Sequence, residues 1–268
     1  MIDIRMATRA DIPAICELWH AAFPTDSKDE CVTFLNAISL NEDCVVACQK
    51  SKPISMAFFI PSILRTANQD LPVRYLYAAS TLPSHRNQGV FSQLLRWSHC
   101  RWREKGVAAC FLNPAEPSLV GFYQRFGYQP IAFSRTIEGK AGLKPSDVTP
   151  LSAVEYQELR TALLPTESFV WQNAMIQYAT LYGTPVRIGK AACAFCELHG
   201  SNLRIVDMLG IEQSSQRDVC KALAAQFGCD TFTARLHTED GDCYGMLAPL
   251  NGEQVLLTTS PYIGLVFD

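Results

Sequence analysis

The segment between residues 73 and 105 constrains the fold more than any other part of the chain, because a strand, a sharp turn and a helix follow one another there. Val73–Thr81 is rich in apolar and aromatic residues, contains neither Pro nor Gly, and ends just before Pro83, which is typical of a buried strand. After Gly89, apolar residues recur at helical spacing as far as Lys105. This succession predicts an α/β protein.

The turn between the predicted strand and helix presents the first amides of that helix. Unpaired N–H groups and the positive end of the helix dipole favour an anion at such a position. We therefore expect the amides from Arg86 to Phe91 to hold a diphosphate, with Gly89 allowing its close approach. A polar loop with an ordinary turn glycine is the alternative interpretation of the same residues.

The spacing of Arg86, Gly89 and Phe91 resembles motif A of the GCN5-related N-acetyltransferases (GNATs), whose usual form is Arg/Gln-x-x-Gly-x-Gly/Ala. Phe91 departs from the last position of that motif. A bulky residue there also occurs in tandem-domain members of the family, such as the enhanced-intracellular-survival type acetyltransferases. The departure therefore hints at that subfamily.

A second motif follows in the order that the family uses. Val107–Leu112 has the pattern of a buried strand, Asn113 follows it, and a helix is expected to begin at Pro117. The run Phe122-Tyr123-x-x-x-Gly127-Tyr128 then resembles motif B, in which Phe-Tyr-x-x-x-Gly-Phe recurs. The resemblance covers roughly the first half of the chain.

The resemblance implies acetyl-CoA as co-substrate and direct transfer of its acetyl group, in a ternary complex without a metal ion, to a primary amine of a small molecule or a peptide. A backbone N–H near Ser80 to Leu82 would polarise the thioester carbonyl. The residues that the resemblance implies for binding the cofactor are Ser80, Thr81, Leu82, Arg86, Asn87, Gln88, Gly89, Val90, Phe91 and Asn113.

Tyr123 is the general acid that the resemblance implies for the sulfur of CoA. A phenol, with an ordinary pKa of about 10, can donate a proton to a thiolate of comparable basicity. The alternative is that this tyrosine, beside Phe122, is only a packing residue.

The general base is harder to assign, because many relatives use a Glu on the motif strand and Val73–Thr81 contains no Asp or Glu. Tandem-type relatives insert their C-terminus into the active site, so the C-terminal carboxylate at Asp268 is a candidate, reached through the apolar tail Tyr262–Phe267. The alternative is that this tail completes a sheet and that water removes the proton.

The 268 residues exceed what one such domain needs. We expect a GNAT domain that binds acetyl-CoA at 1–140, a linker at 141–150 and, at 151–268, a second, shortened GNAT-like α/β domain without the cofactor motif. Its turn at 210–218 carries Glu212 and Asp218, which would repel a diphosphate.

The remaining patterns predict the elements of a mixed sheet with helices in both halves. Strands are expected at 2–8, 44–49, 54–63, 191–198, 203–209, 231–236 and near Leu256, and helices at 12–23, 29–40, 153–164, 168–181 and 215–227.

Composition bears on partners and location. The net charge is −3, and basic residues form no block apart from Arg96 to Lys105, where alternating apolar residues imply a solvated helix face. We therefore expect no nucleic acid as partner. Eleven cysteines, with no leader and no long apolar span, favour a cytoplasmic protein that does not enter a membrane. Cys193 and Cys196 would point to opposite faces of a strand, which disfavours a metal site. The sequence leaves a homo-oligomer open.

One alternative from a different class of function remains. The first domain can bind an acyl-CoA as a non-catalytic sensor or partner-binding module, since the missing strand carboxylate is compatible with lost chemistry.

Overall fold

The computed structural model describes residues 2–143, 147–252 and 255–266, and the chain divides into two compact units. The N-terminal unit comprises residues 1–64, 70–129 and 246–256. The C-terminal unit comprises residues 65–69, 130–245 and 257–268.

The N-terminal unit is built on a mixed sheet with the strand order β1-β2-β3-β4-β5-β13. The pairs β1–β2, β2–β3 and β5–β13 are antiparallel, whereas β4 and β5 are parallel. The strands are β1 (Ile2–Met6), β2 (Cys44–Gln49), β3 (Lys52–Arg65), β4 (Asp70–Thr81), β5 (Ala109–Leu112) and β13 (Asp242–Pro249), of which Met246–Pro249 pairs with β5.

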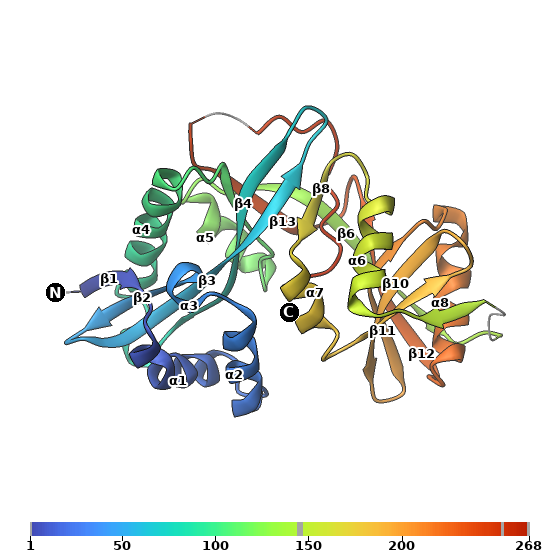
Figure 1. The fold of residues 1–268 in the computed structure, drawn as a ribbon, viewed down its shortest axis with the longest axis horizontal. Coiled ribbons are helices and arrows are strands. Elements are labelled where there is room, and N and C mark those ends of the chain that lie inside the picture. Colours follow the sequence, from blue (N-terminus) through green and yellow to red (C-terminus); the bar gives the residue numbers. More distant parts are fainter. Residues whose placement is uncertain (1, 144–146, 253–254, 267–268) are drawn as a thin grey trace. The chain divides into compact units, whose positions relative to one another are not determined.

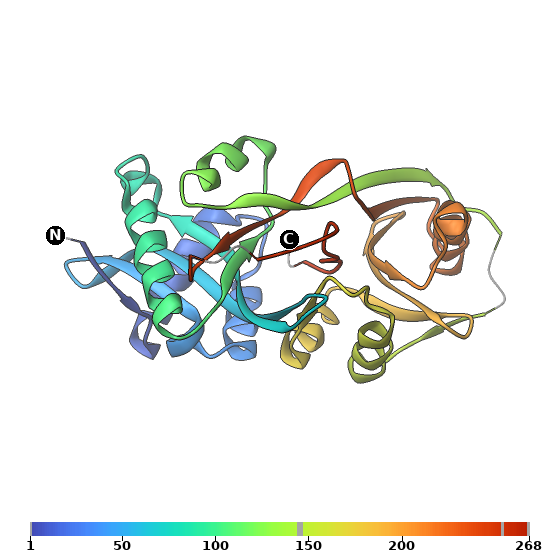
Figure 2. The same cartoon turned by 90° about the horizontal axis from the view of Figure 1, so that it is seen from above.

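Helices cover both faces of this sheet (Figure 1), and Figure 2 shows α4 from above. They are α1 (Ile12–Ala22), α2 (Lys28–Ala37), α3 (Leu40–Asp43), α4 (Val90–Glu104) and α5 (Val120–Gln124), with 3-10 turns at Arg9–Asp11, Pro83–His85 and Pro117–Leu119. Beneath α1 and α2 lies an aromatic cluster in which Trp19 contacts Phe34 and Phe58 at centroid distances of 5.3 and 6.0 Å. On the other face, α4 buries Leu94, Leu95 and Trp102 at the helical spacing predicted from the sequence.

The strands of the C-terminal unit are also mixed in direction and follow the order β6-β12-β11-β10-β9-β7. Only β11 and β12 are parallel among the pairs β6–β12, β12–β11, β11–β10, β10–β9 and β9–β7 that the structure describes. Figures 1 and 2 show α6 and α8 on opposite sides of these strands. The elements are β6 (Gln129–Lys140), β7 (Val148–Pro150), α6 (Ala153–Leu163), β8 (Ser168–Trp171), α7 (Asn173–Ala179), β9 (Thr184–Ile188), β10 (Ala192–His199), β11 (Asn202–Leu209), α8 (Gln216–Gln226) and β12 (Thr231–Thr238).

A buried ion pair lies inside the C-terminal unit. Arg160 Nε donates to Asp207 Oδ2 at 2.7 Å, and both side chains are almost fully excluded from solvent. Arg160 Nη2 also donates to the Ile263 carbonyl at 2.9 Å, and the Tyr262 hydroxyl donates to Asp207. These bonds fix the segment around Tyr262 to the interior of the unit, because each charge depends on the others for its hydrogen bonds.

Two sequence predictions for the second half are wrong. The helix expected at 168–181 is shorter, because Ser168–Trp171 is strand β8: its Phe169 N–H donates to the Tyr262 carbonyl at 2.8 Å. Leu256 lies outside any strand and is 73% exposed, whereas the strand in that region is β13.

The division between the units also differs from the boundary expected near residue 140. The last residues of the domain expected at 1–140 belong to β6, which continues to Lys140 because its residues 133–140 pair with β12. Residues 130–140 accordingly fall in the C-terminal unit. No helix among the described residues is long and apolar enough to span a membrane.

Candidate active site

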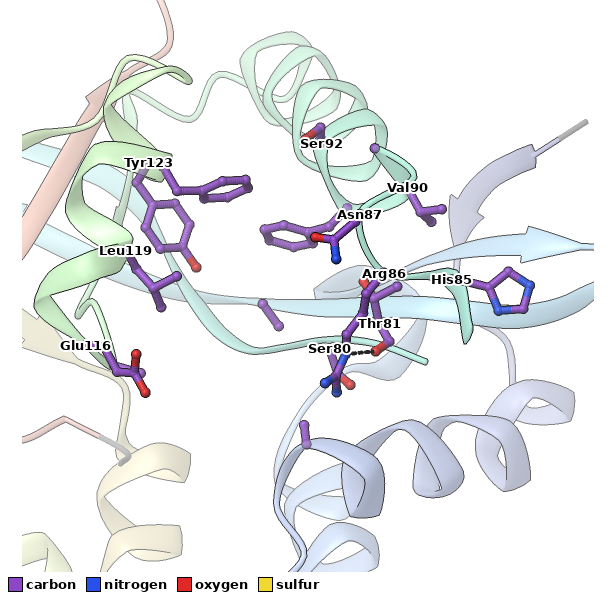
Figure 3. Close-up of a pocket in the computed structure, with 16 residues that line it drawn as sticks. Ser80, Thr81, His85, Arg86, Asn87, Val90, Ser92, Glu116, Leu119 and Tyr123 are labelled. Carbon is purple, nitrogen blue, oxygen red and sulfur yellow. Dashed lines mark hydrogen bonds between the residues drawn. The ribbon is translucent and has the colours of Figure 1, made fainter. Parts of the chain in front are cut away.

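The N-terminal unit contains a pocket of about 640 Å³ between the end of β4, the start of α4 and the segment around α5 (Figure 3). It is lined by Ala22, Ala79, Ser80, Thr81, His85, Arg86, Asn87, Gly89, Val90, Phe91, Ser92, Ala115, Glu116, Leu119, Phe122 and Tyr123.

The pocket forms where β4 leaves its parallel neighbour. The two strands pair only at Val73–Tyr75, opposite Ala109–Phe111, although β4 continues to Thr81. Ala78 lies just beyond the paired segment with φ of 45°, a left-handed conformation that costs a non-glycine residue about 1 kcal/mol. The diverging backbone brings Ala79, Ser80 and Thr81 into the pocket wall.

Side chains from neighbouring elements hold the end of β4 in place. Ser80 is buried, and its Oγ donates to the Leu18 carbonyl of α1 at 2.8 Å. Ser55 Oγ donates to the Ser80 carbonyl at 2.8 Å, and Leu82 N–H donates to the Ile54 carbonyl at 3.0 Å. The Leu82 amide and the Ser80 hydroxyl are therefore both already hydrogen-bonded within the protein.

The turn that follows leads directly into α4. Asn87 and Gly89 have φ of 60° and 72°, and Gly89 stands at the N-cap without a capping side chain. The first turn of α4 contains no acidic residue, so its N-terminal amides and partial positive charge are not neutralised by the helix itself. A Cβ on Gly89 would meet no atom within 4 Å, so the space beside this residue is open.

Polar side chains brace the turn from within. Arg86 Nε donates to the Thr81 carbonyl at 3.0 Å, and Gln88 Nε2 donates to the Ser84 carbonyl at 2.9 Å. Arg86 thereby adds a positive charge beside the start of α4, whereas Gln88 stabilises the conformation of the turn. The turn has the geometry and the charge of an anion site.

Tyr123 faces the turn from α5. Figure 3 shows its hydroxyl pointing into the pocket. Burial raises the pKa of Tyr123 to about 12, because the charged phenolate would lose its hydration. The phenol therefore stays protonated at neutral pH and is available as a hydrogen-bond donor to a developing negative charge.

Phe91, the departure from motif A, packs against α5. Its ring is stacked on that of Phe122 with a centroid distance of 6.0 Å and an interplanar angle of 22°. The bulky residue thus contacts a second aromatic wall of the pocket instead of blocking the turn.

The pocket brings together most of the residues expected from the sequence: Ser80, Thr81, Arg86, Asn87, Gly89, Val90, Phe91 and Tyr123. Leu82, Gln88 and Asn113 are not among the described residues that line it. Asp268 lies outside the described residues. The sequence reasoning missed Glu116 and His85, which also line the pocket. Their nearness to the two motifs was the available signal.

Comparison with known proteins relates the chain to acetyltransferases. Residues 3–131 match the family model of an acetyltransferase (GNAT) domain. No curated protein matches the sequence. Among solved structures, a GCN5-related N-acetyltransferase from Anabaena variabilis is similar with a TM-score of 0.75 and 16% identity, covering 94% of this chain and 73% of that one.

Two further structures share the fold. Eis1 from Mycobacterium abscessus aligns with a TM-score of 0.67 and 15% identity, covering 93% of this chain and 74% of that one. A putative acetyltransferase from Pyrococcus horikoshii aligns with a TM-score of 0.62 and 13% identity, covering 99% of this chain and 94% of that one.

The chain has the mixed α/β fold of the solved GCN5-related N-acetyltransferase (GNAT) structures. Its residues 3–131, just under half of the chain, match the acetyltransferase (GNAT) domain family. This match supports acyl transfer from acetyl-CoA as the general activity.

Proposed function

We propose that this protein is an N-acetyltransferase that moves the acetyl group of acetyl-CoA to a primary amine by direct transfer in a ternary complex. The observation that carries the proposal is the single pocket in which the uncapped start of α4 and the hydroxyl of Tyr123 face the same space. An anion site and a proton donor are the two features that a CoA thioester requires of its enzyme.

The turn from Arg86 to Phe91 binds the diphosphate of acetyl-CoA in this proposal, through backbone amides and the Arg86 charge. The open space beside Gly89 allows phosphate oxygens to approach the backbone. The diverging end of β4, at Ala79 to Thr81, then faces the pantetheine arm and the thioester.

In the transfer step, the neutral amine nitrogen attacks the thioester carbonyl carbon, the C–S bond breaks, and the nitrogen loses a proton. Tyr123 donates its hydrogen bond to the sulfur as negative charge develops there. With its pKa raised to about 12, the phenol acts mainly by this hydrogen bond, since full transfer of its proton to a thiolate is unfavourable. The base remains the Asp268 carboxylate or water.

The test is the substitution Tyr123→Phe, followed by CoA release in the presence of a primary amine and by acetyl-CoA titration. We expect kcat to fall by about 10- to 100-fold, because the transition state loses one hydrogen bond to a charged atom. The Kd for acetyl-CoA should stay within about twofold of the unaltered protein, because the turn is untouched.

Tyr178→Phe in the C-terminal unit is the matched control, because it also removes one tyrosine hydroxyl from a buried ring. Its turnover should equal that of the unaltered protein. Unchanged turnover in Tyr123→Phe would exclude the assigned role. Binding of acetyl-CoA without CoA release from any primary amine tested would favour the sensor alternative instead.

A further inference from the structure

Glu116 is the one carboxylate among the described residues that line the pocket. It precedes the 3-10 turn Pro117–Leu119, in the segment between β5 and α5. Its Oε2 accepts a hydrogen bond from Ser118 Oγ at 3.1 Å, which orients the carboxyl group from the side of its own loop. The residue is exposed, so its charge is hydrated and can be approached by a ligand.

The pocket is electrostatically divided. Figure 3 shows Glu116 on the same wall as Leu119 and Tyr123, whereas Arg86 lies on the opposite wall with Ser80 and Thr81. The described charged side chains in the lining are therefore a cation beside the start of α4 and an anion beside α5, with His85 as the further titratable group on the Arg86 side. One wall is therefore complementary to an anionic group and the other to a cationic group, and the two groups can belong to two different ligands.

The anionic group is the diphosphate of acetyl-CoA, which binds at the turn because the helix amides and Arg86 attract it. A carboxylate repels a diphosphate, so Glu116 gains nothing from the phosphates of acetyl-CoA. Its charge is complementary to the acceptor instead, because primary amines are cationic at neutral pH.

The reacting nitrogen is not the group that Glu116 suits best. A carboxylate next to an ammonium stabilises the charged form and raises its pKa, which lowers the fraction of neutral amine that can attack. A second ammonium, which does not react, can be held by a carboxylate without this cost. By binding this second ammonium, the Glu116 carboxylate positions the reacting amine of the same molecule near Tyr123.

From this arrangement we infer that Glu116 selects the acceptor, and that the acceptor class is a small amine with a second cationic group, as in an aliphatic diamine. The inference rests on the proposed transferase function. Glu116 acts in binding and specificity, and it takes no proton in the transfer step.

The experiment compares 1,4-diaminobutane with n-butylamine, which has the same carbon chain without the second charge. The first readout is calorimetric binding of each amine to the protein saturated with CoA. We expect the diamine to bind, and Glu116→Gln to weaken that binding about fivefold, the size expected for one solvent-accessible charge pair. Binding of n-butylamine, which has no second ammonium, should change less between the two proteins than binding of the diamine. Raising the salt concentration should reduce the preference for the diamine.

The second readout is kcat/KM for CoA release with each amine. Glu116→Gln should lower kcat/KM for the diamine through KM, leave kcat nearly unchanged, and affect n-butylamine less. Glu116→Asp should retain part of the preference because it keeps the charge. Glu104→Gln, at the exposed end of α4 and outside the described pocket lining, is the matched control and should behave like the unaltered protein.

Equal diamine binding in Glu116→Gln and the unaltered protein, or no preference of the unaltered protein for the diamine over n-butylamine, would overturn the inference. Loss of the proposed function has a different signature. Selective, Glu116-dependent diamine binding without CoA release from either amine would contradict the transferase activity while supporting Glu116 as a cation-binding residue.

Discussion

Each unit contains one parallel strand–helix–strand segment, β4–α4–β5 in the N-terminal unit and β11–α8–β12 in the C-terminal unit. The topology is the same, but the turns before the two helices differ. Gly89 stands at the cap of α4 with φ of 72° and open space around it. Gly210 follows β11 with φ of 78°, and a Cβ there would collide with the Ala191 carbonyl oxygen.

The comparison shows that similar backbones use glycine for different reasons. Open space beside Gly89 leaves room for a ligand, whereas Gly210 is required by close packing of its own chain. The charges differ in the same sense, because α4 has no acid in its first turn and α8 has Asp218 there. We infer that only the N-terminal turn binds a diphosphate.

The largest difference in stability should come from replacing Gly210 and Gly89, one at a time, by alanine. Gly210→Ala should lower the free energy of unfolding by about 3 kcal/mol, because the new Cβ meets the Ala191 carbonyl and the backbone conformation is strained. Gly89→Ala should cost about 1 kcal/mol, from strain alone. Urea unfolding of both variants measures the difference, and equal costs would break the comparison.

Two ion pairs, one from each unit, differ in their exposure to water. Arg5 Nη1 lies 2.7 Å from Asp11 Oδ2 with the arginine one-third exposed, whereas the Arg160–Asp207 pair is buried. The Arg5 guanidinium is the main cause that lowers the pKa of Asp11 to about 2. Since the folded pKa lies below the unfolded one, this stabilisation is present above about pH 4 and is lost as the pH falls towards 2.

Asp11→Asn should therefore lower stability at pH 7 by about 1 kcal/mol, a value reduced from the full pKa shift because Arg5 is partly solvated. At pH 2 the variant and the unaltered protein should differ less. Unfolding curves at both pH values provide the check, and a difference that does not shrink in acid would refute the assignment of this pair.

The smallest effect is expected from removing the two acids near the C-terminal turn. Asp218 pairs with Lys221 Nζ at 2.8 Å on an exposed helix face. The double substitution Glu212→Gln with Asp218→Asn should create no second acetyl-CoA site, because packing at Gly210 still leaves no space. Calorimetric stoichiometry detects this outcome. A second bound equivalent would mean that charge alone separates the two turns.

The part of the site that depends on local sequence was predictable. Gly89, the helix after it and the Phe-Tyr run are contiguous signals, and the structure begins α4 at Val90 directly after Gly89. The divergence of β4 from β5 is implied by the family resemblance, but the residues alone do not predict it. It involves Ala78 in a left-handed conformation, and an alanine in the sequence gives no sign of that conformation.

Pairing between distant segments explains the other misses. Ser168–Trp171 has helix-compatible neighbours, yet its partner is Tyr262, far along the chain. The β5 strand likewise gains an antiparallel neighbour from Met246–Pro249. A pattern read along the sequence contains no information on which remote strand supplies the hydrogen bonds. Glu116 was missed because a single exposed Glu in a loop forms no pattern of its own, and its nearness to the motif at 122–128 was its only signal.

The central claim is that the turn before α4 binds acetyl-CoA. Its most direct test is calorimetric titration of the protein with acetyl-CoA beside two variants, Gly89→Glu and Gly106→Glu. The control adds the same charge at φ of 75°, also with no atom within 4 Å of the new Cβ, at the far end of α4. The account predicts one bound equivalent for the unaltered protein and the control, and an affinity at least about 100-fold weaker for Gly89→Glu, through bulk and repulsion of the diphosphate. Equal binding by both variants, or no binding by the unaltered protein, would contradict it.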